Sequence, residues 1–142
     1  MFSASAIDPR TIQAYLETHY CVDAQPAFTL QVGQVNAVLR VAHTQHNTDC
    51  SAYLTACNPY SQPLDDAANA RRQAAMAAQL TRLKLAFLPG VGKHPSNQWP
   101  GEASFLVFGL TLQAAKALAA QYEQNAIIWN AADGIPQLIV LR

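Results

Sequence analysis

The chain has 142 residues, of which 51% are hydrophobic and 13% are charged, and its formal net charge at pH 7 is zero. A chain of this length forms one domain, residues 1–142, with its own hydrophobic core, and its low charge content excludes a disordered tail. The neutral balance argues against a protein that binds nucleic acid or a membrane surface by bulk electrostatic attraction.

The sequence also bears on location. No hydrophobic run approaches the roughly 20 residues that span a bilayer, and the N-terminus lacks the basic and apolar segments of a signal peptide. Cys21, Cys50 and Cys57 are odd in number and show no CxxC spacing. We therefore expect reduced thiols in a cytoplasmic protein that has no membrane partner.

Four segments have the periodicity of helices. Asp8 and Pro9 suit the N-cap and first position of a helix that continues to about residue 20. Apolar spacing predicts a second helix over residues 35–46. Asp65 or Asp66 caps a long helix over residues 67–84, and Thr111 caps an alanine-rich helix that ends near residue 122.

Compact apolar runs predict the strands, at residues 28–32, 51–57, 86–91, 104–108, 127–129 and 137–141, and the last two form a hairpin. Helices and strands that alternate in this way indicate a sheet with helices packed on it. The expected fold is α/β (α+β-like), with about four helices on one mixed sheet of about five to six strands. The steps from strand to strand exclude a purely doubly wound sheet.

The long helix has an unusual apolar stripe. Met76, Leu80 and Leu83 share one face, and the same face begins at the helix N-terminus with Asn69 and Arg72. An amphipathic helix normally begins its stripe with apolar residues. In α/β folds this end of a helix also lies beside the strand end where ligands bind.

Free backbone N–H groups at a helix N-terminus and the forked guanidinium of Arg72 favour an anion. Asn58, Tyr60 and Ser61, in the turn before the helix, are expected to line the same mouth. The alternative is that Asn69 and Arg72 only satisfy carbonyl groups of that turn, since buried polar groups need partners in either case.

The middle of the chain adds two features. Residues 67–101 contain five Lys or Arg residues and no acid, which indicates an electropositive side, or merely a solvated basic helix face. The loop over residues 90–102 is long and rich in Gly and Pro, which is typical of functional loops. Its GVGK segment fails the P-loop pattern, so we exclude an NTPase. Trp99 could stack on a ring or anchor the loop to the core, and Glu102 is a weak candidate for an acid or base.

A metal site is not expected. His43 and His46 are three residues apart on a predicted helix, but no third ligand is near in sequence and HEXXH is absent. No nucleophile elbow is present, and no cysteine has an evident histidine partner. We therefore predict neither a metal nor a cofactor.

Five short motifs occur in a fixed order: N-P-Y-S at 58–61, N-A-R-R at 69–72, P-G-V-G at 89–92, W-P-G-E-A-S-F at 99–105 and Q-N-A-I-I-W at 124–129. Together they resemble the bacterial "domain of unknown function 3293" family over about residues 15–142. The family often has Glu before the Asn of the helix motif, where this chain has Ala68. The resemblance brings no established activity. It implies one constellation of polar residues, namely Asn58, Ser61, Asn69, Arg72, Trp99, Glu102, Ser104, Gln124 and Asn125.

Three functions fit these features. The first is a domain that binds a small anionic or nucleotide-like ligand through Asn58, Ser61, Asn69, Arg72, Trp99, Glu102, Gln124 and Asn125. The second is an enzyme at the same pocket, with Glu102 as acid or base and Arg72 as charge stabiliser, and it requires a partly buried Glu102 with a raised pKa. The third is a protein-interaction module without a pocket. For Gln124 and Asn125 a purely structural role in a turn is an equal alternative, and the oligomeric state is not predicted.

Overall fold

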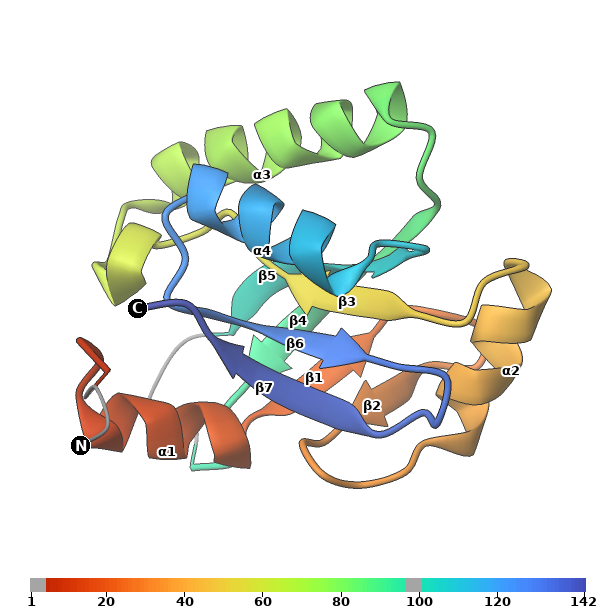
Figure 1. The fold of residues 1–142 in the computed structure, drawn as a ribbon. Coiled ribbons are helices and arrows are strands. Elements are labelled where there is room, and N and C mark those ends of the chain that lie inside the picture. The colour runs from red at the N-terminus through yellow and green to blue at the C-terminus, as the bar shows by residue number, and fades with distance from the viewer. Residues whose placement is uncertain (1–4, 97–100) are drawn as a thin grey trace.

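The computed structural model describes residues 5–96 and 101–142. Its four helices are α1 (Pro9–Glu17), α2 (Ala37–Gln45), α3 (Asp66–Arg82) and α4 (Leu112–Gln121), with a short 3-10 turn, η1 (Pro59–Ser61). Its seven strands are β1 (His19–Val22), β2 (Phe28–Leu30), β3 (Ser51–Leu54), β4 (Phe87–Lys93), β5 (Glu102–Phe108), β6 (Ala126–Asn130) and β7 (Pro136–Val140). The part of the chain described is therefore the predicted single-domain α+β fold (Figure 1).

The predicted helix starts are confirmed by their capping side chains. Asp8 accepts from the amide of Arg10, Asp65 from the amide of Ala68, and Thr111 from the amide of Ala114. Each bond satisfies one backbone donor that has no partner within its helix.

The first helix is shorter than predicted, and the strand that follows it was missed. Thr18 is extended, and His19–Val22 forms β1, which pairs with both β2 and β4. Tyr15 and His19 have helical spacing, but two flanking strands offer the backbone of residues 19–22 hydrogen bonds that outweigh this local pattern. The missed strand raises the count to seven.

The expectation of a mixed sheet is wrong. The strand order is β2-β1-β4-β5-β3-β6-β7, and each of the six neighbouring pairs is antiparallel. Helices α3 and α4 each connect two strands that run in the same direction but are separated by one antiparallel strand. Helical crossovers therefore gave the alternation expected of parallel pairing although no parallel neighbours exist among these strands.

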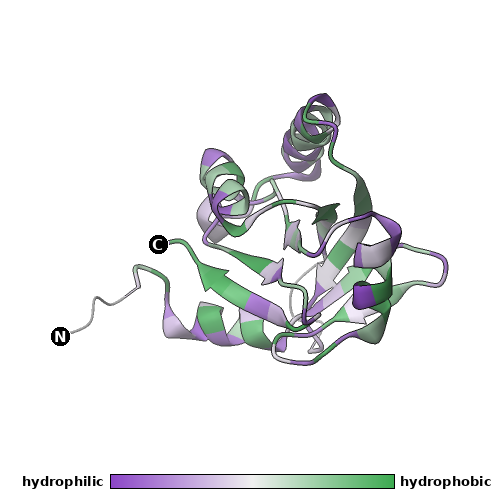
Figure 2. Cartoon of the chain, turned by 45° about the vertical axis from the view of Figure 1, so that its right-hand side comes forward, coloured by the Kyte–Doolittle hydropathy of each residue, from purple (hydrophilic) through white to green (hydrophobic). Residues whose placement is uncertain are grey.

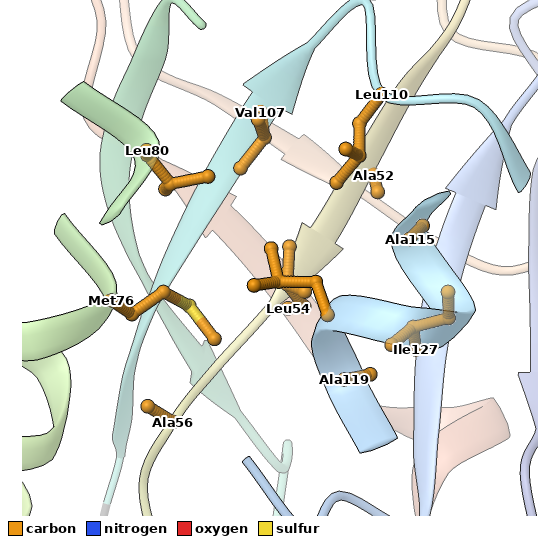
Figure 3. Close-up of a cluster of buried hydrophobic side chains, with 11 residues drawn as sticks. Ala52, Leu54, Ala56, Met76, Leu80, Val107, Leu110, Ala115, Ala119 and Ile127 are labelled. Atoms are coloured by element: carbon orange, nitrogen blue, oxygen red, sulfur yellow. The ribbon is translucent and has the colours of Figure 1, made fainter. Parts of the chain in front are cut away.

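One face of the sheet is covered by α3 and α4 (Figure 1). Met76 and Leu80 of α3 and Ala115 and Ala119 of α4 are buried against Leu54 and its neighbours on the strands (Figure 3). Leu83, which was predicted to share this stripe, is 55% exposed because it lies beyond the last helical residue. Figure 2 shows the same division, with hydrophobic residues concentrated along the strands and mixed hydropathy on the helices.

The opposite face of the sheet is covered unevenly. Helix α2 buries Leu39 and Ala42 against Leu30, Leu106 and Phe108 at one end. Helix α1 lies over the other end and contributes no buried residue. This second face is where a cavity forms.

Candidate functional site

A cavity of about 660 Å³ lies between α1 and the sheet face opposite α3 and α4. Thr11, Ala14 and Tyr15 line it from α1, and Tyr20 and Tyr53 are part of its aromatic floor. Its volume is within the range of small-molecule sites, about 300–1,000 Å³, which are typically concave and largely apolar with a few placed polar groups. The fold therefore has room for a small molecule at this end of the sheet.

Antiparallel register places the floor residues on one face. Tyr20 of β1 pairs with Gly92 of β4, which in turn pairs with Glu102 of β5. Because successive side chains of a strand alternate between faces, Ser104 lies on the same face as Glu102. Both residues line the cavity. Gly92 has no side chain and so leaves open space between the tyrosine and the carboxylate.

Glu102 is the carboxylate of the cavity floor. Its Oε2 atom accepts a hydrogen bond of 2.9 Å from Asn58 Nδ2, and the described residues offer no hydrogen bond to Oε1. Burial raises the pKa of Glu102 above its ordinary value, and the bond from Asn58 offsets part of this rise. A half-buried carboxyl group with a raised pKa is the condition that the enzyme hypothesis set for Glu102.

Asn58 and Asn69 form one hydrogen-bonded unit behind Glu102. The backbone N–H of Asn58 donates to Asn69 Oδ1 at 2.9 Å, and Asn69 Nδ2 donates to Asn58 Oδ1 at 2.8 Å. The same Oδ1 atom also accepts from the amide of Leu64 at 3.0 Å. The side chain of Asn58 is thus oriented so that its remaining donor points at Glu102. The start of α3 therefore fixes the hydrogen-bond partner of the cavity carboxylate.

The segment that carries Asn58 is strained. Asn58, Tyr60 and Ser61 have φ values of 49°, 52° and 60°, in the left-handed region. For residues other than glycine this conformation costs on the order of 1–2 kcal/mol each, least for Asn, and such residues concentrate at functional sites. Tyr60 N–H donates to Glu123 O at 2.6 Å, which is one of the bonds that maintain the conformation.

Arg72 takes part in this support and does not line the cavity. Its Nε donates to Ala56 O and its Nη2 donates to Tyr122 O, both at 2.6 Å, and Nη1 lies 3.5 Å from the Glu123 carboxylate. The guanidinium therefore joins the end of β3 to the end of α4. This is the alternative in which Arg72 satisfies carbonyls of the surrounding turns. The ion pair with Glu123 gives the arginine an acidic partner, although this chain has Ala68 where the resemblance described above implied a Glu.

Gln124 both stabilises the neighbouring backbone and lines the cavity. Its Nε2 donates to Cys57 O at 3.0 Å and to Tyr122 O at 3.1 Å, which secures the segment before Asn58. The side chain lines the cavity and is only 8% exposed. Both amide protons are used, and no described residue donates to Oε1, so this oxygen is an available acceptor.

The remaining predicted site residues are Ser61, Asn125 and Trp99. Ser61 lines the cavity and accepts from or donates to Tyr15 Oη at 2.8 Å, whereas Asn125 stands behind it and donates to Ser61 Oγ at 2.9 Å. Trp99 lies outside the described residues. Of the predicted ligand-binding set, the structure thus gathers these residues at the cavity wall: Asn58, Ser61, Asn69, Glu102 and Gln124.

Sequence reasoning missed the lining residues that come from the missed strand and from the first helix. Tyr15 was assigned only to a helix face, and Tyr20 was assigned to the end of that helix. Asp66 and His94 also line the cavity, and His94 Nε2 lies 3.3 Å from Glu17 Oε1. Burial alternates along residues 19–22, but this pattern is visible only in the structure, so no signal in the sequence pointed to Tyr20.

The charges around the cavity do not form a basic surface. Three carboxyl groups line it, from Asp8, Asp66 and Glu102, together with the cation Arg10 and the imidazole of His94. Arg10 is paired with Asp8 at 3.1 Å, and its side chain is 92% exposed. The acid-free region of residues 67–101 therefore contributes little positive charge to the cavity.

The other reactive side chains are used structurally. His43 is buried, and its Nε2 hydrogen-bonds to Ser51 Oγ at 2.7 Å, while His46 stacks on Phe108. Cys21, Cys50 and Cys57 are free, as predicted. Burial raises the pKa of Cys57, which disfavours a nucleophilic thiolate. Within residues 5–96 and 101–142 no group of three His, Cys, Asp or Glu side chains is arranged to bind a metal.

Comparison with known proteins gives one match. A family model described as "Protein of unknown function (DUF3293)" matches residues 54–127, which contain α3, β4, β5 and α4. No curated protein and no solved structure matches the chain. Over the part that the structure describes, no helix is both long and hydrophobic enough to cross a membrane.

Proposed function

The chain belongs to the DUF3293 family of proteins of unknown function, and we propose that it binds a small molecule in the cavity beneath α1. One observation carries this proposal: Glu102 is a half-buried carboxylate on the cavity floor whose second oxygen has no partner among the described residues. Unpaired charge is costly to bury, so a retained carboxylate of this kind indicates a ligand contact.

The surrounding residues support the proposal. Asn69 orients Asn58, and Asn58 orients Glu102. Arg72 and Gln124 stabilise the backbone before Asn58, so in this proposal Arg72 is a positioning residue. A site of this kind, with its polar groups locked by a surrounding network, is preorganised for binding.

The hypothesis of an anionic or nucleotide-like ligand, which came from the sequence, requires that the guanidinium of Arg72 be available to the ligand. Two carbonyl oxygens and Glu123 bind the Nε, Nη2 and Nη1 atoms of that guanidinium, and Arg72 does not line the cavity, so the geometry gives less support to an anion than to a ligand that donates hydrogen bonds.

A thermal-shift panel of metabolites tests the proposal, because a ligand that binds only the folded state stabilises it by about 2.7 kcal/mol at 100 times its Kd. Compounds that raise Tm are then titrated against Ala14→Trp, which fills the cavity from α1. Gln13→Trp, on the exposed face of α1, is the matched control. We expect binding to survive in the control and to be lost in the cavity variant. A panel without a hit, or a hit that both variants retain equally, contradicts the proposal. Capture of a protein partner in place of any small molecule would favour the interaction module.

An enzyme is the second candidate function, and the raised pKa of Glu102, caused by burial, specifically favours it. In that case Glu102 transfers a proton to or from the bound ligand. Turnover of a panel hit by the wild-type protein and its loss in Glu102→Gln, with binding retained, would support the enzyme. Unchanged ligand after long incubation would exclude it for that compound.

A further inference from the structure

Two side-chain acceptors of the cavity lining have no hydrogen-bond partner among the described residues. Glu102 Oε1 and Gln124 Oε1 receive no hydrogen bond from the described residues. The side-chain amide donors of Asn69 and Gln124 are already engaged, that of Asn69 on Asn58 and Leu64, and that of Gln124 on Cys57 and Tyr122. The lining around these two acceptors is therefore complementary to a ligand that donates hydrogen bonds.

The hydroxyl groups of the floor do not alter this balance. Tyr20 Oη donates to Tyr15 O at 2.6 Å, and Tyr53 Oη donates to Cys21 O at 2.8 Å. Ser104 Oγ donates to the backbone oxygen of Glu102 at 3.1 Å. Each of these hydroxyl protons has a partner inside the protein.

The charged groups and aromatic rings of the lining also favour a ligand that donates hydrogen bonds and carries positive charge. Besides Glu102, the titratable or charged groups that line the cavity are Asp8, Arg10, Tyr15, Tyr20, Tyr53, Asp66 and His94. The cation Arg10 is paired with Asp8, and His94 lies beside Glu17. Tyr20 and Tyr53 both line the cavity and meet edge to face, with ring centroids 5.3 Å apart. Such rings attract organic cations.

We propose that the ligand of this cavity is an organic cation, an amine, amidine or guanidine with an apolar body, whose charged N–H group binds the Glu102 carboxylate. This inference rests on the proposed function and names its ligand class. Charge-assisted hydrogen bonds of this kind are about twice as strong as neutral ones. The apolar body lies over the tyrosine floor.

Four matched probes test the inference: benzamidine and benzylamine as cations, benzyl alcohol as the neutral analogue and benzoate as the anion. Titrations followed by the amide NMR signals of the full chain at pH 7.5 give the affinities. We expect both cations to bind at least about tenfold more tightly than benzyl alcohol and benzoate. The largest shifts are expected at Glu102, Gln124 and Tyr20. Glu102→Gln should reduce this preference to less than about twofold, whereas Asp49→Asn, which removes an exposed acid outside the cavity, should retain it.

The number of protons released on binding provides a second readout, independent of affinity. A cation stabilises the charged form of Glu102 and lowers its pKa, so binding below neutral pH releases protons. Calorimetry of benzamidine in two buffers of different ionisation enthalpy measures that release, and it should vanish in Glu102→Gln. Benzoate binding as tightly as benzamidine, a preference unchanged in Glu102→Gln, or no response to any of the four probes overturns the inference. The metabolite panel and the Ala14→Trp variant decide the proposed function separately.

Discussion

At the scale of single residues, the buried Glu102 carboxylate lowers the stability of the folded state, although the proposal requires it for ligand binding. Burial raises its pKa, so the folded state takes up a proton more readily than the unfolded state, and stability falls as pH rises above the ordinary value. Glu102→Gln removes this charge and can keep the bond from Asn58. We expect the variant to have a higher Tm than the wild type at pH 7.5, with the difference shrinking toward pH 4. Thermal melts at the two pH values measure it, and a less stable variant at pH 7.5 would contradict it.

His43 gives a second pH dependence of the opposite sign. Burial lowers its pKa, with a smaller opposing effect from Asp49 and a further lowering by His46. Unfolding therefore takes up a proton as pH falls below about 6.5, and the stability that neutral His43 contributes is lost there. His43→Gln should cost about 1–3 kcal/mol at pH 7.5, by disturbing the bond to Ser51, and should reduce the loss of stability between pH 7.5 and 5. Urea unfolding at both pH values is the measurement, and an unchanged pH dependence in His43→Gln would contradict the prediction.

At the scale of elements, Arg72 joins β3 to α4 through two backbone carbonyls. Lysine has no planar fork and cannot reproduce both bonds. Arg72→Lys should therefore destabilise the fold by about 1–3 kcal/mol. Arg71→Lys, one residue earlier on the exposed face of α3, should change stability by no more than about 0.5 kcal/mol. Chemical denaturation measures both variants, and equal effects would show that the carbonyl contacts contribute nothing specific.

The pairing of β1 with β4 depends on Gly90. A methyl group at this position would overlap the carbonyl oxygen of Cys21 and lie 2.9 Å from Tyr53 Oη, whereas at Gly92 the nearest atoms are 3.7 Å away. Gly90→Ala should cost about 1–3 kcal/mol or more, because backbone of a neighbouring strand must move. Gly92→Ala should remain within about 1 kcal/mol of the wild type. Comparison of their Tm values checks this, and a tolerated Gly90→Ala would refute the close approach.

At the scale of the whole molecule, the two sheet faces differ in how firmly they are covered. Helices α3 and α4 bury apolar residues, but α1 buries none and closes the cavity through a few polar contacts. Elements with few buried contacts open locally at low free energy. Hydrogen exchange should therefore be fastest in α1 among the four helices, and a bound ligand should slow it. If the amides of α1 were as strongly protected as those of α4, the claim that α1 packs less firmly on the sheet would be contradicted.

Local signals in the sequence were sufficient for much of the fold. Capping residues such as Asp8, Asp65 and Thr111 located three helix starts, and the runs that contain Leu54, Leu106 and Ile128 located the central strands. Strand β1 was missed because four residues carry too little periodicity, and only pairing with strands distant in sequence makes them extended. The prediction of a mixed sheet was wrong for a related reason. Helices α3 and α4 each connect two strands that run in the same direction, but an antiparallel strand lies between them in the sheet.

For the candidate site, too, the sequence was sufficient for some features, and others depended on the tertiary structure. By itself the sequence determined that Asn69 and Arg72 are unusual, because polar groups in an apolar stripe stand out without coordinates. Asn58 and Glu102 were candidates from the turn and the loop that contain them, and Gln124 came only from the family resemblance. Only the tertiary structure decided how they divide. It showed that Arg72 binds backbone carbonyls, that Glu102 lies on a cavity floor with Tyr20 of the missed strand, and that the Oε1 atoms of Glu102 and Gln124 have no partner among the described residues. Hydrogen-bond direction and charge balance arise from which elements meet in space, and they changed the expected ligand from an anion to a proposed cation.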